Sequence, residues 1–440
     1  MNHTHSVRDE LNTEIARQGY TLSSFSKASG INRGVLSLTL NDQATKSFSM
    51  NQLNQMTEAL QFPAGWLYER YAQEMLVDIE NVSWRRIKDL LTHCLTLEKM
   101  ELIEMVLDAL QDKASYTNYI FSLAEELTEQ NVNADLCIFY QYVLDHEVNL
   151  QNERFTISQY RLFRANLGLD LQKSFKSTIQ FTPYRHALPI HLKLDALAQL
   201  INVSFAVKDW DALKQYGEEL VTSTILVYNT IIERQHPYIK KSERSLLVYY
   251  GKGYIAQAVS LEYKGHYEES KELTTQYEDL SWFKFLDDTD KAQVEKFLII
   301  AKCNRYNLEL LQGNASVLKP YIDYLEFFPE EQPASIEIII KSSNMHKWDI
   351  DGILEKYHDI IYPTDALHYL QTTTTYSIIS EINRYTNIYY DLALYYFERK
   401  DRTDQLEHVL TKLKSHIEQY NRINAFDSSE LFEKLCKFYF

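Results

Sequence analysis

The stretch from Tyr20 to Asn41 reads YTLSSFSKASGINRGVLSLTLN and predicts two short helices joined by a tight turn. Thr21 is a residue type that caps helix N-termini, so the first helix is expected to begin directly after it. Gly30 stands where the turn requires a left-handed residue, because glycine adopts a positive φ at little cost. Asn32 is expected to cap the second helix in the same way.

The second helix has an apolar side and a polar side. Val35, Leu36 and Leu40 follow a helical spacing and are expected to face the core. The outer, N-terminal side is where a recognition helix reads base edges in the major groove. Lys27 and Lys46 are the basic residues nearest to it and are predicted to contact phosphates. The predicted outer residues of the helix are Asn32, Arg33, Gly34 and Ser37.

The flanking sequence predicts further short helices over 7–15, 53–60 and 63–68, the last with Pro63 in its first turn. Together with Gly-Ile-Asn-Arg-Gly-Val-Leu-Ser at 30–37, this pattern resembles the phage-repressor (Cro, Xre) domain. The resemblance covers about the first 70 residues and implies a helix-turn-helix DNA-binding domain over residues 1–72. The alternative is a set of ordinary helices in a larger bundle.

Two positions depart from the usual pattern of that family. Ser26 stands where a small residue, commonly Ala, packs the two helices together, and Asp42 stands where Gly is common. Neither residue is sterically forbidding.

Composition favours long helices in a chain of two or three domains. The 440 residues include only 11 Gly and 8 Pro, against 32 Tyr and 20 Phe, so turns are few and aromatic packing is abundant. No apolar run is long enough to span a membrane and no signal peptide is evident. The four cysteines lie far apart, without metal-ligand spacing, which indicates a reduced, cytoplasmic protein.

The charge is distributed unevenly. The formal net charge is −16, but residues 1–72 carry equal numbers of basic and acidic side chains, so the acidic excess lies in the rest of the chain. An acidic body repels DNA, so binding must come from a localised set of residues and from two copies of it.

The remainder of the chain predicts helix after helix, with a linker over 73–82 and a helical repeat domain over 83–440. The clearest repeat runs from Tyr254 through Gly265 to Ser270 and resembles the tetratricopeptide (TPR) signature, with Ser270 where Ala is usual. Weaker copies have Lys208 in place of the turn glycine, or match in the turn at Gly313. The resemblance implies an all-α protein whose second domain is a right-handed TPR-like solenoid. An irregular all-α bundle is the alternative.

The sequence contains no recognisable catalytic motif. The chain has no G-x-x-x-x-G-K-[ST], G-x-S-x-G or H-E-x-x-H motif and no EF-hand loop. Gly251-Lys252-Gly253 is interpreted as a close helix contact and not as a phosphate loop. We therefore expect neither an enzyme nor a bound cofactor or metal.

Asparagine recurs inside otherwise apolar helices of the repeat domain. Its amide offers both a donor and an acceptor, which is the pair that holds an extended peptide backbone. Two neighbouring arginines are candidates for the carboxylate of such a peptide. The predicted peptide-binding residues are Asn202, Asn229, Asn304, Arg305, Asn307, Asn383, Arg384 and Asn387.

A repressor-type domain followed by degenerate TPR-like hairpins resembles the RRNPP receptors (Rap, NprR, PlcR, PrgX and Rgg), with the arbitrium and Alo-type receptors as neighbouring branches. The resemblance implies a cytoplasmic quorum-sensing transcription regulator, a homodimer that binds promoter DNA and a short signalling peptide. The apolar segment 431–440 is expected to pack on a repeat or on a second copy. Two alternatives stay open: an interaction protein that inhibits a partner, as Rap-type members do, and an all-α hydrolase or transferase.

Overall fold

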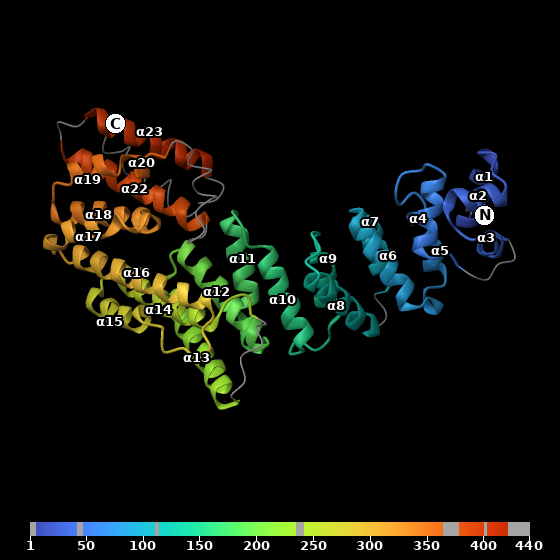
Figure 1. The fold of residues 1–440 in the computed structure, drawn as a ribbon, viewed down its shortest axis with the longest axis horizontal. Coiled ribbons are helices and arrows are strands. Elements are labelled where there is room, and N and C mark those ends of the chain that lie inside the picture. The colour runs from blue at the N-terminus through green and yellow to red at the C-terminus, as the bar shows by residue number, and fades with distance from the viewer. Residues whose placement is uncertain are drawn as a thin grey trace. The chain divides into compact units, whose positions relative to one another are not determined.

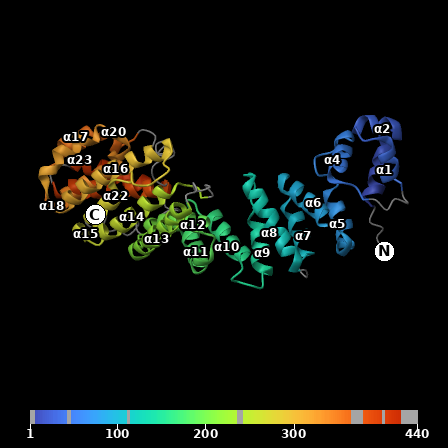
Figure 2. The same ribbon diagram turned by 60° about the horizontal axis from the view of Figure 1, so that its bottom comes forward.

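Helices joined by turns and loops make up the residues that the computed structural model describes, which are 6–41, 47–110, 114–234, 242–363, 378–399 and 403–420 (Figure 1). No strand occurs within these ranges, and the turned view shows coiled ribbons only (Figure 2). The all-α prediction is confirmed for this part of the chain. The contacts divide the chain into two compact units, residues 1–162 and 163–440, which we call unit 1 and unit 2.

Unit 1 begins with short helices whose first turns are closed by side chains. Ser6, Thr21 and Ser49 each accept a hydrogen bond from the backbone two or three residues into the helix, as N-caps do. Its helices are α1 (Val7–Arg17), α2 (Leu22–Ser29), α3 (Arg33–Thr39), α4 (Met50–Ala59), α5 (Tyr68–Val77), α6 (Trp84–Thr96), α7 (Met100–Asp108), α8 (Ala114–Glu129), α9 (Cys137–His146) and α10 (Glu153–Ala165), which runs across the boundary.

The helix predicted over 63–68 is wrong. Residues 64–67 form turns, and the helix begins only at Tyr68. Gly65 explains the difference, because its φ of +74° lies in the left-handed region and interrupts a helix.

One apolar core runs through unit 1 from Val7 to Val143. The segment predicted as a linker, 73–82, contains the end of α5 and a short 3-10 turn, Ile79–Asn81. The domain boundary placed at 73–82 stays a prediction.

Unit 2 consists largely of long helices arranged as consecutive hairpins. A 3-10 segment at Thr182–Ala187 precedes the first long pair, and longer and shorter helices alternate between residues 246 and 356. Its helices are α11 (Leu171–Phe181), α12 (Ile190–Ala206), α13 (Trp210–Arg234), α14 (Leu246–Tyr263), α15 (Tyr267–Glu278), α16 (Asp288–Leu311), α17 (Leu318–Leu325), α18 (Gln332–His346), α19 (Asp351–Lys356), α20 (His358–Ile361), α22 (Ile378–Glu398) and α23 (Thr403–Tyr420).

A single left-handed residue marks the turn of six hairpins, α6–α7, α8–α9, α12–α13, α14–α15, α16–α17 and α18–α19. Gly265 and Gly313 adopt φ values of +80° and +90°, as the repeat pattern predicts. Lys208 adopts +59° at the position where the pattern has lysine for glycine. The repeat position of Ser270 is buried, and its hydroxyl donates to the Ala258 carbonyl oxygen at 2.8 Å. The remaining turns of this kind contain Glu98, Asn131 and Lys347.

Helices α12, α14, α16, α18 and α22 form a closed cycle of contacts in unit 2. Each packs against the next in this order, and α22 packs against α12. The Asn383 amide of α22 donates to the carbonyl oxygen of Ala206, the last residue of α12, at 3.4 Å. Side chains on these five helices therefore meet although they lie far apart in the sequence.

Two glycines bring α14 close to its neighbours. A Cβ on Gly253 would lie 2.8 Å from the Gly217 carbonyl oxygen of α13, and a Cβ on Gly251 would enter the Phe297 ring of α16. The interpretation of Gly251-Lys252-Gly253 as a helix contact is confirmed.

Candidate functional site

The predicted DNA-reading face is the exposed side of α3. Arg33 and Ser37 are exposed, whereas Leu36 and Leu40 are buried and Val35 is half-buried. Of the residues assigned to this face, Asn32 and Gly34 are exposed as well. The sequence therefore predicted the orientation of this helix, although its binding of DNA stays a prediction.

The turn between α2 and α3 holds α3 in place. The Asn32 carboxamide oxygen accepts from the Gly34 amide at 2.8 Å, and Gly30 has a φ of +70°. Ser26, which departs from the family pattern, donates its hydroxyl to the Ile31 carbonyl oxygen at 2.7 Å. The serine thus bonds directly to the turn that a smaller residue would only pack against.

The two predicted phosphate contacts have different outcomes. Lys27 is exposed on α2, while Lys46 lies outside the described residues, as does Asp42. The sequence reading overlooked Leu38, whose side chain is 69% exposed on α3. The sequence did indicate this residue, because Leu38 is apolar but does not belong to the helical spacing of the residues that face the core. An exposed leucine on such a face suits contact with a thymine methyl group.

The predicted peptide-binding asparagines fall into three environments. Asn229 is exposed on α13. Asn307 is buried in α16, and its oxygen accepts from the Tyr321 hydroxyl at 2.9 Å. The others are half-buried and bonded within the chain; for example, the Asn304 amide donates to the Tyr277 hydroxyl at 2.9 Å. The structure therefore does not bring all of them to one surface.

The two predicted arginines already have acidic partners. Arg305 pairs with Glu278 and donates to the Thr274 hydroxyl at 3.1 Å. Arg384 is buried and pairs with Glu381, which is fully buried. A peptide carboxylate would have to compete with these partners, and the assignment of the carboxylate to these arginines stays a prediction.

A cluster of charged and polar side chains from α14, α18 and α22 surrounds Arg384. Glu337 lies 3.5 Å from the Arg384 guanidinium and accepts from the Asn387 amide at 2.7 Å. The Lys341 ammonium lies 5.0 Å from the centroid of the Tyr263 ring. We call this group the polar cluster; its members are Glu262, Tyr263, Glu337, Lys341, Glu381, Arg384, Asn387 and Asp391.

Electrostatics in the polar cluster favour protonated carboxyls. Burial raises the pKa of Glu262 to about 7, and Lys341 opposes this shift. Burial and the neighbouring Glu337 raise the pKa of Asp391 to about 7. Burial also raises the pKa of Glu337. The cluster has four carboxyl groups and two cations. Because the pKa values of Glu262 and Asp391 lie at about 7, the net charge of the cluster changes with pH near neutrality.

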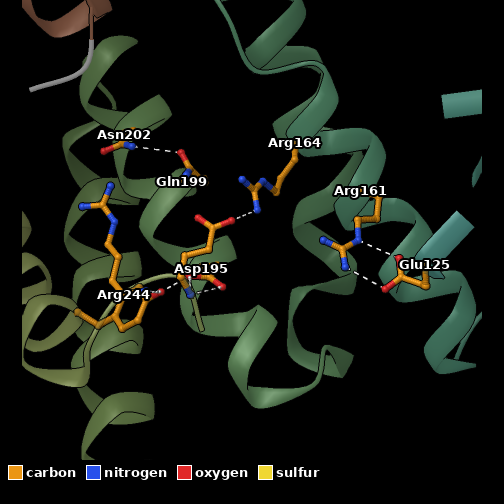
Figure 3. A network of polar contacts seen from close by, with 9 residues as sticks. Glu125, Arg161, Arg164, Asp195, Gln199, Asn202 and Arg244 are labelled. Atoms are coloured by element: carbon orange, nitrogen blue, oxygen red, sulfur yellow. Dashed lines mark hydrogen bonds and ion pairs between the residues drawn. The ribbon is translucent and has the colours of Figure 1, made fainter. Parts of the chain in front are cut away.

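A second polar group lies between α12 and α14 (Figure 3). The Lys252 ammonium donates to the Asn202 carboxamide oxygen at 2.7 Å, and the Asn202 amide donates to Gln199 at 3.2 Å. Asp195 is buried one turn before Gln199 and accepts hydrogen bonds from the Tyr249 hydroxyl and from the backbone before α14. Of these residues, the sequence reading had identified only Asn202 as a candidate.

The overlooked charged residues did carry a signal in the sequence. Helix α14 reads LLVYYGKGYIAQAVSLEY, in which Lys252 and Glu262 are the only charged residues. A charged residue in such an apolar run indicates either a buried ion pair or a site. From the sequence, Gly251-Lys252-Gly253 was interpreted only as a close contact between helix backbones, and the lysine side chain was not considered.

Comparison of the chain with protein-family models, with curated proteins and with solved structures gave no match. Within the described ranges, none of the helices has the length and apolar character needed to cross a membrane. The same residues contain no group of three or more acidic, histidine or cysteine side chains placed to hold a metal ion. Cys436 lies outside the described residues, and Cys94 and Cys303 are buried free thiols.

Proposed function

We propose that this chain is a cytoplasmic transcription regulator in which α2 and α3 form a helix-turn-helix that reads DNA. The supporting observation is the face of α3, where Arg33, Ser37 and Leu38 are exposed above a buried Leu36. Arginine contacts guanine bidentately and leucine contacts thymine methyl groups, so the face offers both kinds of base contact.

The proposal assigns the control of DNA binding to unit 2. Its hairpins resemble TPR repeats in their turns at Gly265 and Gly313, and side chains from α14, α18 and α22 converge in the polar cluster. A short linear peptide that contacts several of these helices would bias their relative rotation, because stacked hairpins change pitch by small additive steps. A coupling of about 1–3 kcal/mol would suffice to switch an operator.

The proposal also includes a homodimer. One α3 face with a single arginine is a weak reader, whereas two copies on a symmetric site combine their discrimination. The segment 431–440, which the sequence suggested as a packing or dimer contact, lies outside the described residues.

The test uses the full chain and a pool of random-sequence duplexes, from which bound DNA is recovered and sequenced. We expect the wild type to enrich a symmetric site and Arg33→Ala to lose it, because a bidentate guanine contact contributes about 1–3 kcal/mol per half-site. The matched control is Arg17→Ala, since Arg17 is an exposed arginine of the same unit that pairs with Glu14.

Enrichment of the same site by Arg33→Ala would contradict the assignment of α3. If the wild type enriched no sequence at all, the DNA-binding half of the proposal would fail. A partner-inhibiting interaction protein would then be the better description.

A further inference from the structure

Lys252 is a cation without an acidic partner among the described residues. It lies near the middle of α14, half-buried, and donates to the neutral carboxamide of Asn202 at 2.7 Å. Throughout the described ranges, no carboxylate forms an ion pair with its ammonium group. By contrast, Lys341 and Arg384 in the polar cluster have acidic groups beside them.

A second cation is held beside Lys252. Arg244 precedes α14 and is exposed, and its side chain extends toward the Asn202 amide (Figure 3). Its charge acts on Lys252 strongly enough to lower the pKa of the lysine further, after burial, to about 8. No ion pair of the Arg244 guanidinium occurs in the part of the chain that the structure describes.

A buried anchor fixes the segment that carries Arg244. The Asp195 carboxylate accepts from the Glu243 backbone amide at 3.2 Å and from the Tyr249 hydroxyl. The Tyr249 hydroxyl in turn accepts from the Arg244 backbone amide at 3.1 Å. Asp195 is 3% exposed, so this anchor is part of the packed structure and fixes the backbone from which the Arg244 side chain extends.

Two neighbouring cations without an ion-pair partner among the described residues, one of them bonded to a neutral carboxamide, are suited to bind an oxyanion, because an anion offsets their mutual repulsion. Asn202 already uses its oxygen for Lys252 and its amide for Gln199. It therefore acts as a positioning residue for the ammonium group, although its amide keeps one further N–H donor.

We propose that Lys252 and Arg244 bind the C-terminal carboxylate of the peptide ligand. The inference rests on the proposed function, since it assigns one end of that ligand within unit 2. It also replaces the predicted carboxylate partners, Arg305 and Arg384, with two cations that have no acidic partner in the described chain. An inorganic phosphate shares the oxyanion chemistry and is the competing source.

The experiment measures retention of random hexapeptide pools by the full chain, with mass spectrometry as readout. One pool has free C-termini and the other has C-terminal amides, and inorganic phosphate is added as a competitor in a third arm. We expect amidation to reduce retention by the wild type about tenfold to a hundredfold, the range of a charge-assisted hydrogen bond. For Lys252→Gln we expect equally weak retention of both pools.

The matched control is Lys264→Gln, because Lys264 follows the same helix but pairs with Asp211. This variant should discriminate between the pools as the wild type does. Undiminished discrimination by Lys252→Gln, or equal retention of both pools by the wild type, would overturn the carboxylate assignment while leaving peptide binding intact.

The phosphate arm separates the two anion sources. Displacement of the free-carboxylate pool only at phosphate concentrations far above those of the peptides supports the assignment. Tight phosphate binding that Lys252→Gln abolishes, without any preference for free carboxylates, would identify a phosphate site instead. Retention of neither pool by the wild type would overturn both this inference and the peptide half of the proposed function, whereas the DNA selection would still test the other half.

Discussion

The α3 face and the polar cluster are both rich in polar side chains, but they use them in opposite ways. On α3, Arg33 and Ser37 are exposed to solvent. In the polar cluster, Arg384 and Asn387 are bonded to carboxylates from other turns and helices. A polar residue in a helix is therefore a good candidate for a binding site when it is exposed, and a poor one when other residues of the chain already bond to it.

The difference also separates what each region does for the fold. An exposed polar face contributes little to stability and is free to bind, whereas a buried charge is costly unless its partner remains. The α3 face should therefore tolerate substitution without unfolding, and the polar cluster should not.

The largest expected effect is on the stability of unit 2. Arg384→Ala should lower the free energy of unfolding by about 3–5 kcal/mol, because it removes the cation that pairs with the fully buried Glu381. Arg33→Ala should change it by less than about 0.5 kcal/mol. Denaturant unfolding followed by circular dichroism compares the two. Equal stability losses in both variants would remove the distinction between the regions.

A smaller effect should appear in the pH dependence of stability. The pKa of Asp391 is raised to about 7 in the folded chain, so its contribution is present at low pH and is lost as pH rises through about 7. When the pH rises from 5 to 7.5, the free energy of unfolding of the wild type should fall by about 2 kcal/mol more than that of Asp391→Asn, which has no carboxyl group to ionise at this position. Asp288→Asn, at an exposed position, is the control. Parallel pH profiles for wild type and Asp391→Asn would show that the carboxyl is solvated.

The smallest effect distinguishes two asparagines that the sequence treats alike. Asn307→Ala should cost about 1–2 kcal/mol, since it removes a buried acceptor from the Tyr321 hydroxyl. Asn229→Ala should be neutral within about 0.5 kcal/mol, because Asn229 is exposed. Thermal unfolding measures both. A neutral Asn307→Ala variant would place this residue among the free polar groups and restore it as a ligand candidate.

The sequence was informative wherever one residue fixes the local backbone. Thr21, Gly30 and Asn32 predicted the ends of α2 and α3, because caps and left-handed turns depend on neighbours a few residues away. Even Lys208, an atypical turn residue, was found from its position in the repeat.

Long-range partners were not predictable in the same way. Nothing near Arg384 in the sequence reveals that Glu337 of α18 lies beside it. Nothing near Lys252 reveals that, among the described residues, its ammonium bonds to an amide and pairs with no carboxylate. These facts depend on which helices pack together, and periodicity determines only the face on which a residue lies.

The contact between α22 and α12 makes unit 2 a closed arrangement in which Asn383 bonds to a residue 177 positions earlier. An open array of repeats unravels from its ends, since each repeat contacts only its neighbours. A closed cycle has no free end among its five helices, so opening at any point exposes two faces at once. Its amide protons on α12 and α22 should consequently exchange with solvent as one cooperative unit, and deletion of a single hairpin should disrupt the whole cycle instead of shortening it.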